Sequence, residues 1–164
     1  MGAAQRIVLH FDEIWWAKPD GSLPSFAHGA DEPFPVWWSS LPKKLPILTG
    51  WIGGPRAARL AGLTGEALLA RALESAAALF GERPETLRDR LVASYAHDWV
   101  SDPFALGAYS YGGVGAREAR RVLAAPVSDT LFLAGEATAE GGRNATVHGA
   151  LGSGRRAATE AVGG

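Results

Sequence analysis

Residues 131–162 read LFLAGEATAEGGRNATVHGALGSGRRAATEAV, and this stretch decides how the chain is interpreted. The apolar run Leu131–Ala134 is typical of a buried strand, which would end at Gly135-Glu136. A glycine-rich loop follows, and a helix is expected from about Ala145 to Val162, with its first turn near Thr146. A seam of small residues would let that helix lie close to another backbone, and its members are Ala150, Ser153, Gly154, Ala157, Ala158 and Ala161.

A strand, loop and helix in this order suit a group that carries negative charge. A helix N-terminus presents free backbone N–H groups and a partial positive charge. Such a site would accept a group that becomes anionic, for example the N1–C2=O edge of a reduced flavin. The carboxylate of Glu136 would hold ribityl or ribose hydroxyls, as acidic residues do in dinucleotide sites. The alternative is a structural strand and a capped helix with Glu136 on the surface, and the residues alone leave both open.

The rest of the chain predicts an α+β fold. Strands are expected at 7–11, 46–51 and 91–99, each rich in β-branched or aromatic residues, and Pro and Gly favour loop and hairpin structure over 17–35. A helix is expected from Thr64, as its cap, to Phe80, because apolar residues recur there at helical spacing. Strands and helices mix without strict alternation, which predicts a mixed sheet with flanking helices.

Composition narrows the class of protein. The 164 residues are 47% hydrophobic and 20% charged, which excludes simple disorder. The net charge of −1 gives no basic surface for nucleic acid, so no nucleic-acid partner is expected. The chain has no cysteine for a disulfide or a thiolate metal site, and its four histidines lack metal-ligand spacing, so no metal is expected. No targeting signal and no apolar run of about 20 residues is found, which predicts a cytoplasmic protein without a membrane span.

The stretch 134–154 resembles the C-terminal flavin signature of the FAD-dependent amine oxidases, the superfamily of monoamine oxidases, polyamine oxidases and flavin histone demethylases. That signature is a strand ending in Gly-Glu, a variable loop, and Ala-Thr-Val-His-Gly-Ala followed by Ser-Gly. Other stretches also resemble the family, namely Trp99–Phe104, Gly107–Tyr111, Arg6–Phe11 with Trp15-Trp16, and Ile47–Trp51. The likeness covers the whole chain but only the C-terminal portion of a family member.

The resemblance implies how FAD would be bound. Residues 1–128 would form a substrate-binding region and residues 129–164 a flavin-contacting strand and helix. Three residues at the Gly-Glu motif would approach the ribityl and pyrophosphate part of FAD, namely Gly135, Glu136 and Ala137. Thr146 and Val147 would offer backbone N–H groups to the pyrimidine edge of the isoalloxazine ring. Ala108 stands where monoamine oxidases carry the flavin-linked cysteine, so FAD would be held noncovalently.

The resemblance also implies residues near the reacting atoms. Tyr109 would form an aromatic wall beside the flavin, and Tyr111 is a second candidate because residues 109 and 111 share one face of a strand. Arg6 stands where the family carries a lysine that is hydrogen-bonded to a water near flavin N5. Arginine is bulkier, stays charged and cannot act as a base, so altered oxygen reactivity is expected.

The activity implied is oxidation of a small-molecule amine to an imine, with hydride transfer to FAD and formation of peroxide. No G-x-G-x-x-G follows a strand near residue 1, and Gly152–Ala157 matches the looser pattern only inside a helix. The dinucleotide-binding half would therefore come from a partner chain, from sequence outside this chain or through a homo-oligomer. The alternative is an inactive amine-oxidase-like domain that serves as an oligomerisation or partner-binding module.

Overall fold

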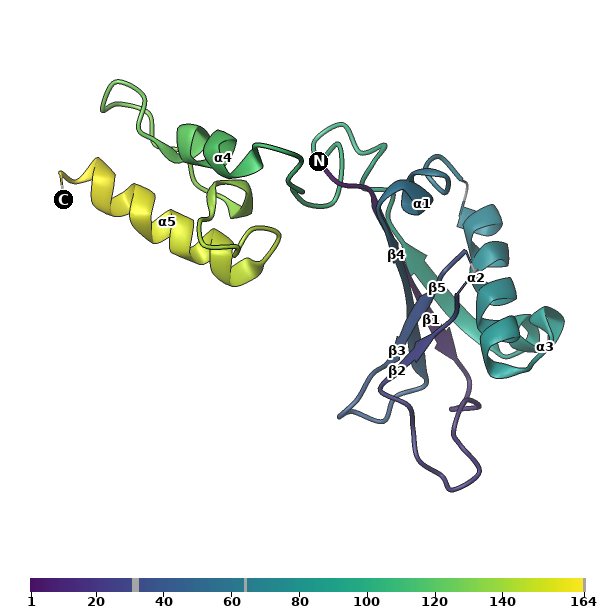
Figure 1. Ribbon diagram of the computed structural model, residues 1–164. Helices are drawn as coiled ribbons and strands as arrows, with labels where there is room; N and C mark the ends of the chain where they lie inside the picture. Colours follow the sequence, from purple (N-terminus) through teal and green to yellow (C-terminus); the bar gives the residue numbers. More distant parts are fainter. Residues whose placement is uncertain (31–32, 64, 164) are drawn as a thin grey trace. The chain divides into compact units, whose positions relative to one another are not determined.

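The computed structural model describes residues 1–30, 33–63 and 65–163, which form two compact units (Figure 1). The sheet unit is Ala3–Gly107, and the C-terminal unit is Met1–Gly2 with Ala108–Gly164. The units divide at Gly107 and Ala108 because residues 116–124 pack with the segments that follow them. The expected division after residue 128 concerned the functions of the two parts and stays a prediction.

The sheet unit contains a five-stranded sheet with the order β2-β3-β4-β1-β5. Its strands are β1 (Ala4–Phe11), β2 (Phe26–His28), β3 (Val36–Ser39), β4 (Ile47–Gly53) and β5 (Leu91–Ala96). Every pair is antiparallel, so the expectation of a mixed sheet is wrong, whereas the α+β class is confirmed. Neighbouring strands β2, β3 and β4 follow one another through short connections, which antiparallel pairing allows and parallel pairing does not.

The strand expected over 91–99 ends at Ala96 because two aspartates fold the chain after it. The Asp98 carboxylate accepts hydrogen bonds from the N–H groups of Val100 and Ser101, at 3.1 and 3.2 Å. The Asp102 carboxylate does the same for Phe104 at 2.8 Å. Aspartate side chains that bond to nearby backbone in this way favour turns over strands.

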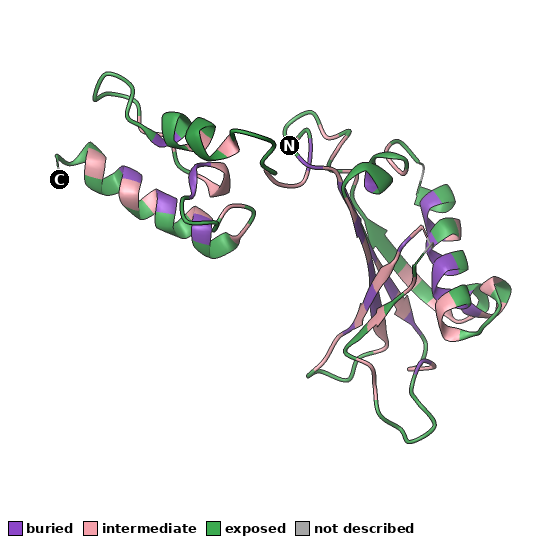
Figure 2. Ribbon diagram, viewed as in Figure 1, coloured by how far each residue is buried: buried purple, intermediate pink, exposed green. Residues whose placement is uncertain are grey.

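Helix α2 (Gly65–Phe80) covers one face of the sheet (Figure 1). Its buried stripe includes Leu68, Leu69, Ala72 and Leu73, as the helical spacing predicts, and it joins Ile7, Leu9 and Leu48 in one core (Figure 2). The cap expected at Thr64 lies outside the described residues. Two short helices flank α2, namely α1 (Pro55–Ala58) and α3 (Pro84–Asp89). Each begins at a proline, whose fixed φ suits a first helical position.

Trp37 on β3 forms the centre of the core beside a glycine of β4. The indole is fully buried and its N–H donates to the Phe34 carbonyl oxygen at 2.9 Å. Trp37 and Gly50 are partners in the β3–β4 ladder, and a Cβ on Gly50 would lie 2.8 Å from the Trp37 ring. Any side chain at position 50 would collide with the Trp37 ring in its present position, so only glycine fits there.

The C-terminal unit contains helix α4 (Ala116–Ala124), the short 3₁₀ helix η1 (Glu136–Thr138) and helix α5 (Val147–Ala161). The strand expected at 131–134 is wrong. Leu131 makes one isolated bridge to Val127 and is 54% exposed, so the apolar run has neither a ladder nor a buried position in the described part of the chain. An apolar run becomes a strand only where a second strand accepts its hydrogen bonds.

Helix α5 confirms the helix expected over 145–162, with bounds one or two residues shorter. Part of the small-residue seam is buried, namely Ser153 and Ala157, whereas Ala158 and Ala161 are exposed. Helix α4 was not among the helices expected from the sequence, because it has only nine residues and buries Ala124 alone. Over the described residues, no helix has the length and apolar character that a membrane span requires.

Candidate functional site

The carboxylate of Glu136 joins three segments of the C-terminal unit. It accepts hydrogen bonds from the Ser110 N–H and the Ser110 hydroxyl, each at 2.7 Å. It also accepts one from the Ala145 N–H at 2.6 Å. Glu136 therefore fixes the position of the 109–111 segment relative to the start of α5. Ser110 was not predicted as a site residue, although it lies in the family-like stretch Gly107–Tyr111, because it is 26 residues from Glu136 in the sequence.

Glu136 is ionised at neutral pH. Its partial burial acts to raise the pKa, but the Ser110 hydroxyl, the Ser110 and Ala145 N–H groups and the charge of Arg120 together hold the pKa below its ordinary value. Because three donors already bond to the carboxylate, its first role is to organise the loop around it. Oε2 already accepts two of these hydrogen bonds and Oε1 accepts one, so only Oε1 keeps an acceptor position for a ligand.

The turn at Gly135 depends on glycine and on a serine of α5. Gly135 has φ 142° and ψ 170°, a conformation that side chains do not tolerate. The Ser153 hydroxyl accepts a hydrogen bond from the Gly135 N–H at 2.9 Å, which ties the turn to α5. Ala137 continues the turn into η1 and is half-buried. The predicted residues Gly135, Glu136 and Ala137 thus lie together beside α5.

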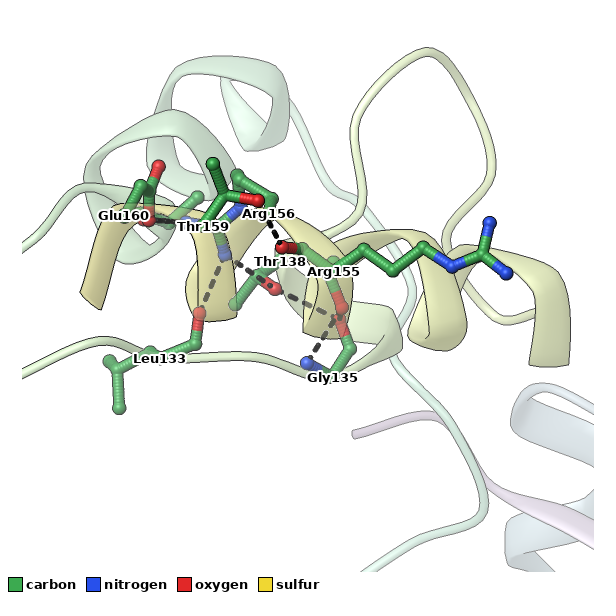
Figure 3. A network of polar contacts seen from close by, with 9 residues as sticks. Leu133, Gly135, Thr138, Arg155, Arg156, Thr159 and Glu160 are labelled. Atoms are coloured by element: carbon green, nitrogen blue, oxygen red, sulfur yellow. Dashed lines mark hydrogen bonds and ion pairs between the residues drawn. The ribbon is translucent and has the colours of Figure 1, made fainter. Parts of the chain in front are cut away.

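Arg156 holds the segment that was expected to be a strand (Figure 3). Its guanidinium donates to the Leu133 carbonyl oxygen at 2.6 Å and to the Ala124 carbonyl oxygen at the end of α4. It also pairs with Glu160 at 2.8 Å, on the same face of α5. A side chain takes the place of the missing ladder, so Arg156 connects α4, the 131–134 segment and α5.

The N-terminus of α5 presents free backbone amides. The Thr146 hydroxyl accepts a hydrogen bond from the Gly149 N–H at 3.0 Å and caps the helix, whose first turn was expected near this residue. The amides of Thr146 and Val147 have no acceptor in the described part of the chain. Free amides at the positive end of a helix fit the polarised carbonyl edge that a flavin would bring.

Two residues shape this helix start. A Cβ on Gly149 would collide with the backbone carbonyl of Arg143, so the glycine lets the preceding loop pass close over the first turn. Ala145 has φ 59°, a left-handed conformation that is uncommon for alanine. That conformation directs the Ala145 N–H to Glu136. A strained backbone conformation of this kind persists where the surrounding structure fixes it, and such conformations cluster at functional sites.

Tyr109 and Tyr111 lie in the same unit as Glu136, on either side of Ser110. The Tyr109 carbonyl oxygen accepts a hydrogen bond from the Gly2 N–H at 2.6 Å. Both rings lie beside Gly2, since a Cβ there would be 3.8 Å from Tyr109 Cε2 and 3.5 Å from Tyr111 Cδ1. Tyr109 is half-buried and Tyr111 is 72% exposed. The structure thus gathers seven of the eight predicted site residues in the C-terminal unit.

Arg6 belongs to the sheet unit. It lies on β1 and is exposed, on the face of the sheet opposite α2, because its neighbours Gln5 and Ile7 are buried. Arg6 is paired with Trp51 in the β1–β4 ladder, and Trp51 is paired with Val36. The next row on the same face holds Val8 and Trp38. An arginine therefore lies among half-buried aromatic and apolar side chains on an open sheet face.

No group of three or more histidine, cysteine, aspartate or glutamate side chains suited to a metal was found among the described residues. Sequence reasoning missed Ser110, Ser153 and Arg156. Ser153 belongs to the Ser-Gly of the signature, which was the available signal, but its contact with Gly135 needs the loop between them to fold back.

A model of the family described as flavin containing amine oxidoreductase matches residues 1–162. Among curated proteins, the chain is 32% identical to lysine-specific histone demethylase 1 homolog 3 of Arabidopsis thaliana, over 98% of this chain and 10% of that protein. It is also 32% identical to polyamine oxidase 3 of Oryza sativa subsp. japonica, over 98% of this chain and 32% of that protein.

The fold is also found in solved structures. Putrescine oxidase bound to putrescine matches with a TM-score of 0.78 and 22% identity, over 98% of this chain and 35% of that chain. The A394C variant of the same oxidase gives a TM-score of 0.79. At this identity the match establishes the fold alone. The chain spans about a tenth to a third of the length of these relatives, and the comparison covers their corresponding part only.

Proposed function

The chain belongs to the flavin containing amine oxidoreductase family, and on that basis we propose that it forms the substrate-side and flavin-closing portion of an FAD-dependent amine oxidase. The proposed reaction oxidises a small-molecule amine to an imine. A dinucleotide-binding half outside this chain would complete the enzyme, because the chain spans a third or less of its relatives named above. When bound, FAD supplies the hydride acceptor, and its reoxidation by O₂ yields hydrogen peroxide.

The start of α5 carries the proposal. The free amides of Thr146 and Val147 would receive the polar edge of the isoalloxazine ring. Glu136 would hold the surrounding loop through Ser110 and Ala145, and Gly135 would let the backbone approach the ribityl chain closely. With Ala108 in place of a cysteine, the chain offers no thiol for a covalent link to FAD.

Tyr109 and Tyr111 are the proposed aromatic wall for the amine. Their position on either side of Ser110 couples them to Glu136, so the loop that would contact the cofactor also sets the tyrosine positions. Arg6 is the third residue proposed to act near the reacting atoms, because it stands where the family carries a lysine. A guanidinium that stays protonated cannot accept a proton from the substrate, so Arg6 would act as a fixed positive charge.

The second candidate function is a partner-binding module without catalysis. Exposed apolar side chains on helices α4 and α5 favour it, and the most exposed are Val122, Val147, Leu151 and Val162. Apolar surface of this kind tends to be covered by another protein surface. Replacement of the family lysine by Arg6 also favours this alternative.

Flavin binding separates the two candidates. The chain is titrated with FAD, alone and mixed with a separately produced dinucleotide-binding half of a polyamine oxidase, and binding is followed by flavin fluorescence. Wild-type chain is expected to retain FAD in the mixture, and Glu136→Ala to lose it while its circular dichroism is unchanged. Glu140→Ala is the matched control, since Glu140 is an exposed acid of the same loop with no side-chain contact to Ser110 or Ala145. Equal FAD retention by Glu136→Ala and wild type would refute the flavin assignment.

A further inference from the structure

A cavity of about 560 Å³ lies between helix α4 and the loop before α5. Helix α4 contributes Arg117, Arg120 and Arg121 to its wall. The opposite wall is formed by residues 139–142 and Asn144. None of the residues proposed to contact flavin lines this cavity. Its volume falls in the range of small-molecule sites, which is about 300–1,000 Å³.

The wall of the cavity carries excess positive charge. Three arginines and one acidic residue, Glu140, line it, and the charge of Arg120 also acts on Glu136. Arg121 also pairs with Glu118 at 3.1 Å, but both side chains are more than half exposed, and an exposed pair of this kind contributes little. Arg117 has no ion-pair or hydrogen-bond partner within the described ranges.

Arg121 lies in the last turn of α4, where the helix dipole favours a cation, but the other two arginines do little to stabilise the helix. Residues 117, 120 and 121 lie on one helical face, and like charges at this spacing repel one another. Arg117 is also in the first turn, where the helix dipole disfavours a cation. The helix has no side-chain cap and buries only Ala124, so packing does not require these arginines either. The cluster is therefore better explained by what it would bind than by folding.

Arg120 connects the cavity to the Glu136 network. Its guanidinium lies against Gly112, where a Cβ would be 3.0 Å from Nη2. Arg120 is half-buried, whereas Arg117 and Arg121 are exposed. Arg120 is thus the least exposed of the three arginines that line the cavity.

We propose that this cavity is a second binding site, distinct from the flavin site, for a small molecule that carries a phosphate group. A guanidinium fork matches the oxygens of a phosphate, and arginine is preferred where such a group is recognised. Three arginines and one glutamate line the cavity, and Arg117 has no acidic partner within the described ranges, so its charge is available to a phosphate oxygen. Gly141 and Gly142, both with positive φ, bring the opposite wall close without side chains.

Calorimetric titration of the purified chain with inorganic pyrophosphate tests this site, because the probe needs neither flavin nor the missing half. Wild type is expected to bind one equivalent. Arg117→Gln with Arg121→Gln should weaken that affinity at least tenfold. Arg155→Gln is the matched control, an exposed arginine of α5 outside the cavity, and its affinity should change less than twofold. Circular dichroism checks that α4 remains helical in each variant.

Two outcomes would overturn the proposal. The first is that wild type does not bind pyrophosphate, or that Arg155→Gln weakens binding as much as the double variant does. The latter result would mean that pyrophosphate is attracted to positive charge in general. The second is displacement of pyrophosphate by FAD in a one-to-one manner, which would make the cavity part of the flavin site. If FAD binding fails while pyrophosphate still binds, the proposed oxidase function is refuted and the proposed phosphate site is not.

Discussion

At the scale of single residues, the carboxylate of Glu136 and the missing side chain of Gly149 matter most. Glu136 collects three donors, and one of them comes from the left-handed Ala145. Gly149 allows the loop to cross the first turn of α5. Both residues shape the same backbone, on which the free amides of Thr146 and Val147 depend.

Replacement of Ser110 by alanine should change how stability depends on pH. Wild-type Glu136 has a lowered pKa, so its contribution to stability is present above the unfolded-state pKa and is lost as pH falls through the lowered folded-state value. Ser110→Ala removes one donor and raises that pKa towards its ordinary value, which shrinks the contribution. Urea unfolding at several pH values between about 3 and 7 measures this. Glu136→Gln is the control, and its free energy of unfolding should depend less on pH over the same range.

Replacement of Gly149 by alanine should destabilise the C-terminal unit. The new Cβ would collide with the Arg143 carbonyl, and overpacking of this kind costs about 1–3 kcal/mol. Gly152→Ala is the matched control in the same helix, since a Cβ there meets nothing within 4 Å. That change should stabilise the helix by about 0.5–1 kcal/mol. Denaturant unfolding compares the two, and equal effects would contradict the close approach.

At the scale of elements, side-chain hydrogen bonds hold the C-terminal unit together, whereas backbone hydrogen bonds between strands hold the sheet unit together. In the sheet, β1 lies between β4 and β5 and α2 covers one face. In the C-terminal unit, Arg156 satisfies the carbonyls of Leu133 and Ala124 that no strand or helix satisfies (Figure 3). A single side chain therefore sets where α4 and the 131–134 segment lie on α5.

Replacement of Arg156 by methionine should loosen this arrangement. The Leu133 and Ala124 carbonyls lose their donor, at a cost of about 1–3 kcal/mol for each group that stays away from water. Hydrogen exchange is expected to rise in α4 and at residues 131–135, and to stay unchanged in β1. Arg155→Met is the control, because the side chain of Arg155 is exposed and points away from the network (Figure 3). Equal exchange in the two variants would show that the Arg156 contacts contribute little.

At the scale of the whole chain, the two units have separate cores and the chain corresponds to only part of its relatives. The large buried side chains belong to the sheet unit, among them Trp37, Phe11, Phe34 and Leu9. The C-terminal unit buries mainly small residues, such as Ala124, Ala139 and Ala157. Unequal cores of this kind predict unequal stability of the units.

A fragment of residues 3–107 should therefore fold by itself. Its expected signs are cooperative unfolding and blue-shifted fluorescence from buried Trp37. A fragment of residues 3–128 is the comparison, since it adds α4 without Arg156 and the rest of its contacts. We expect the longer fragment to be no more stable than the shorter one, as measured by urea unfolding. Higher stability for 3–128 would instead support a division after residue 128.

The sequence by itself determined the family, the strands around residues 7–11 and 46–51, and the helices that became α2 and α5. Periodicity and capping act within a few residues, and the Gly-Glu and Thr-Val-His-Gly motifs are local as well. The sequence also placed Glu136, Thr146 and Val147 in one segment. These features need no knowledge of which distant residues meet.

Only the tertiary structure decided the rest. It replaced the expected strand at 131–134 with a segment held by Arg156, and it added the short elements β2, β3 and α4. It also made Ser110 the partner of Glu136 across 26 residues. Contacts of this kind depend on how the chain folds back on itself. An apolar run becomes a strand, and a carboxylate becomes the centre of a loop, only when the partner arrives from elsewhere in the chain.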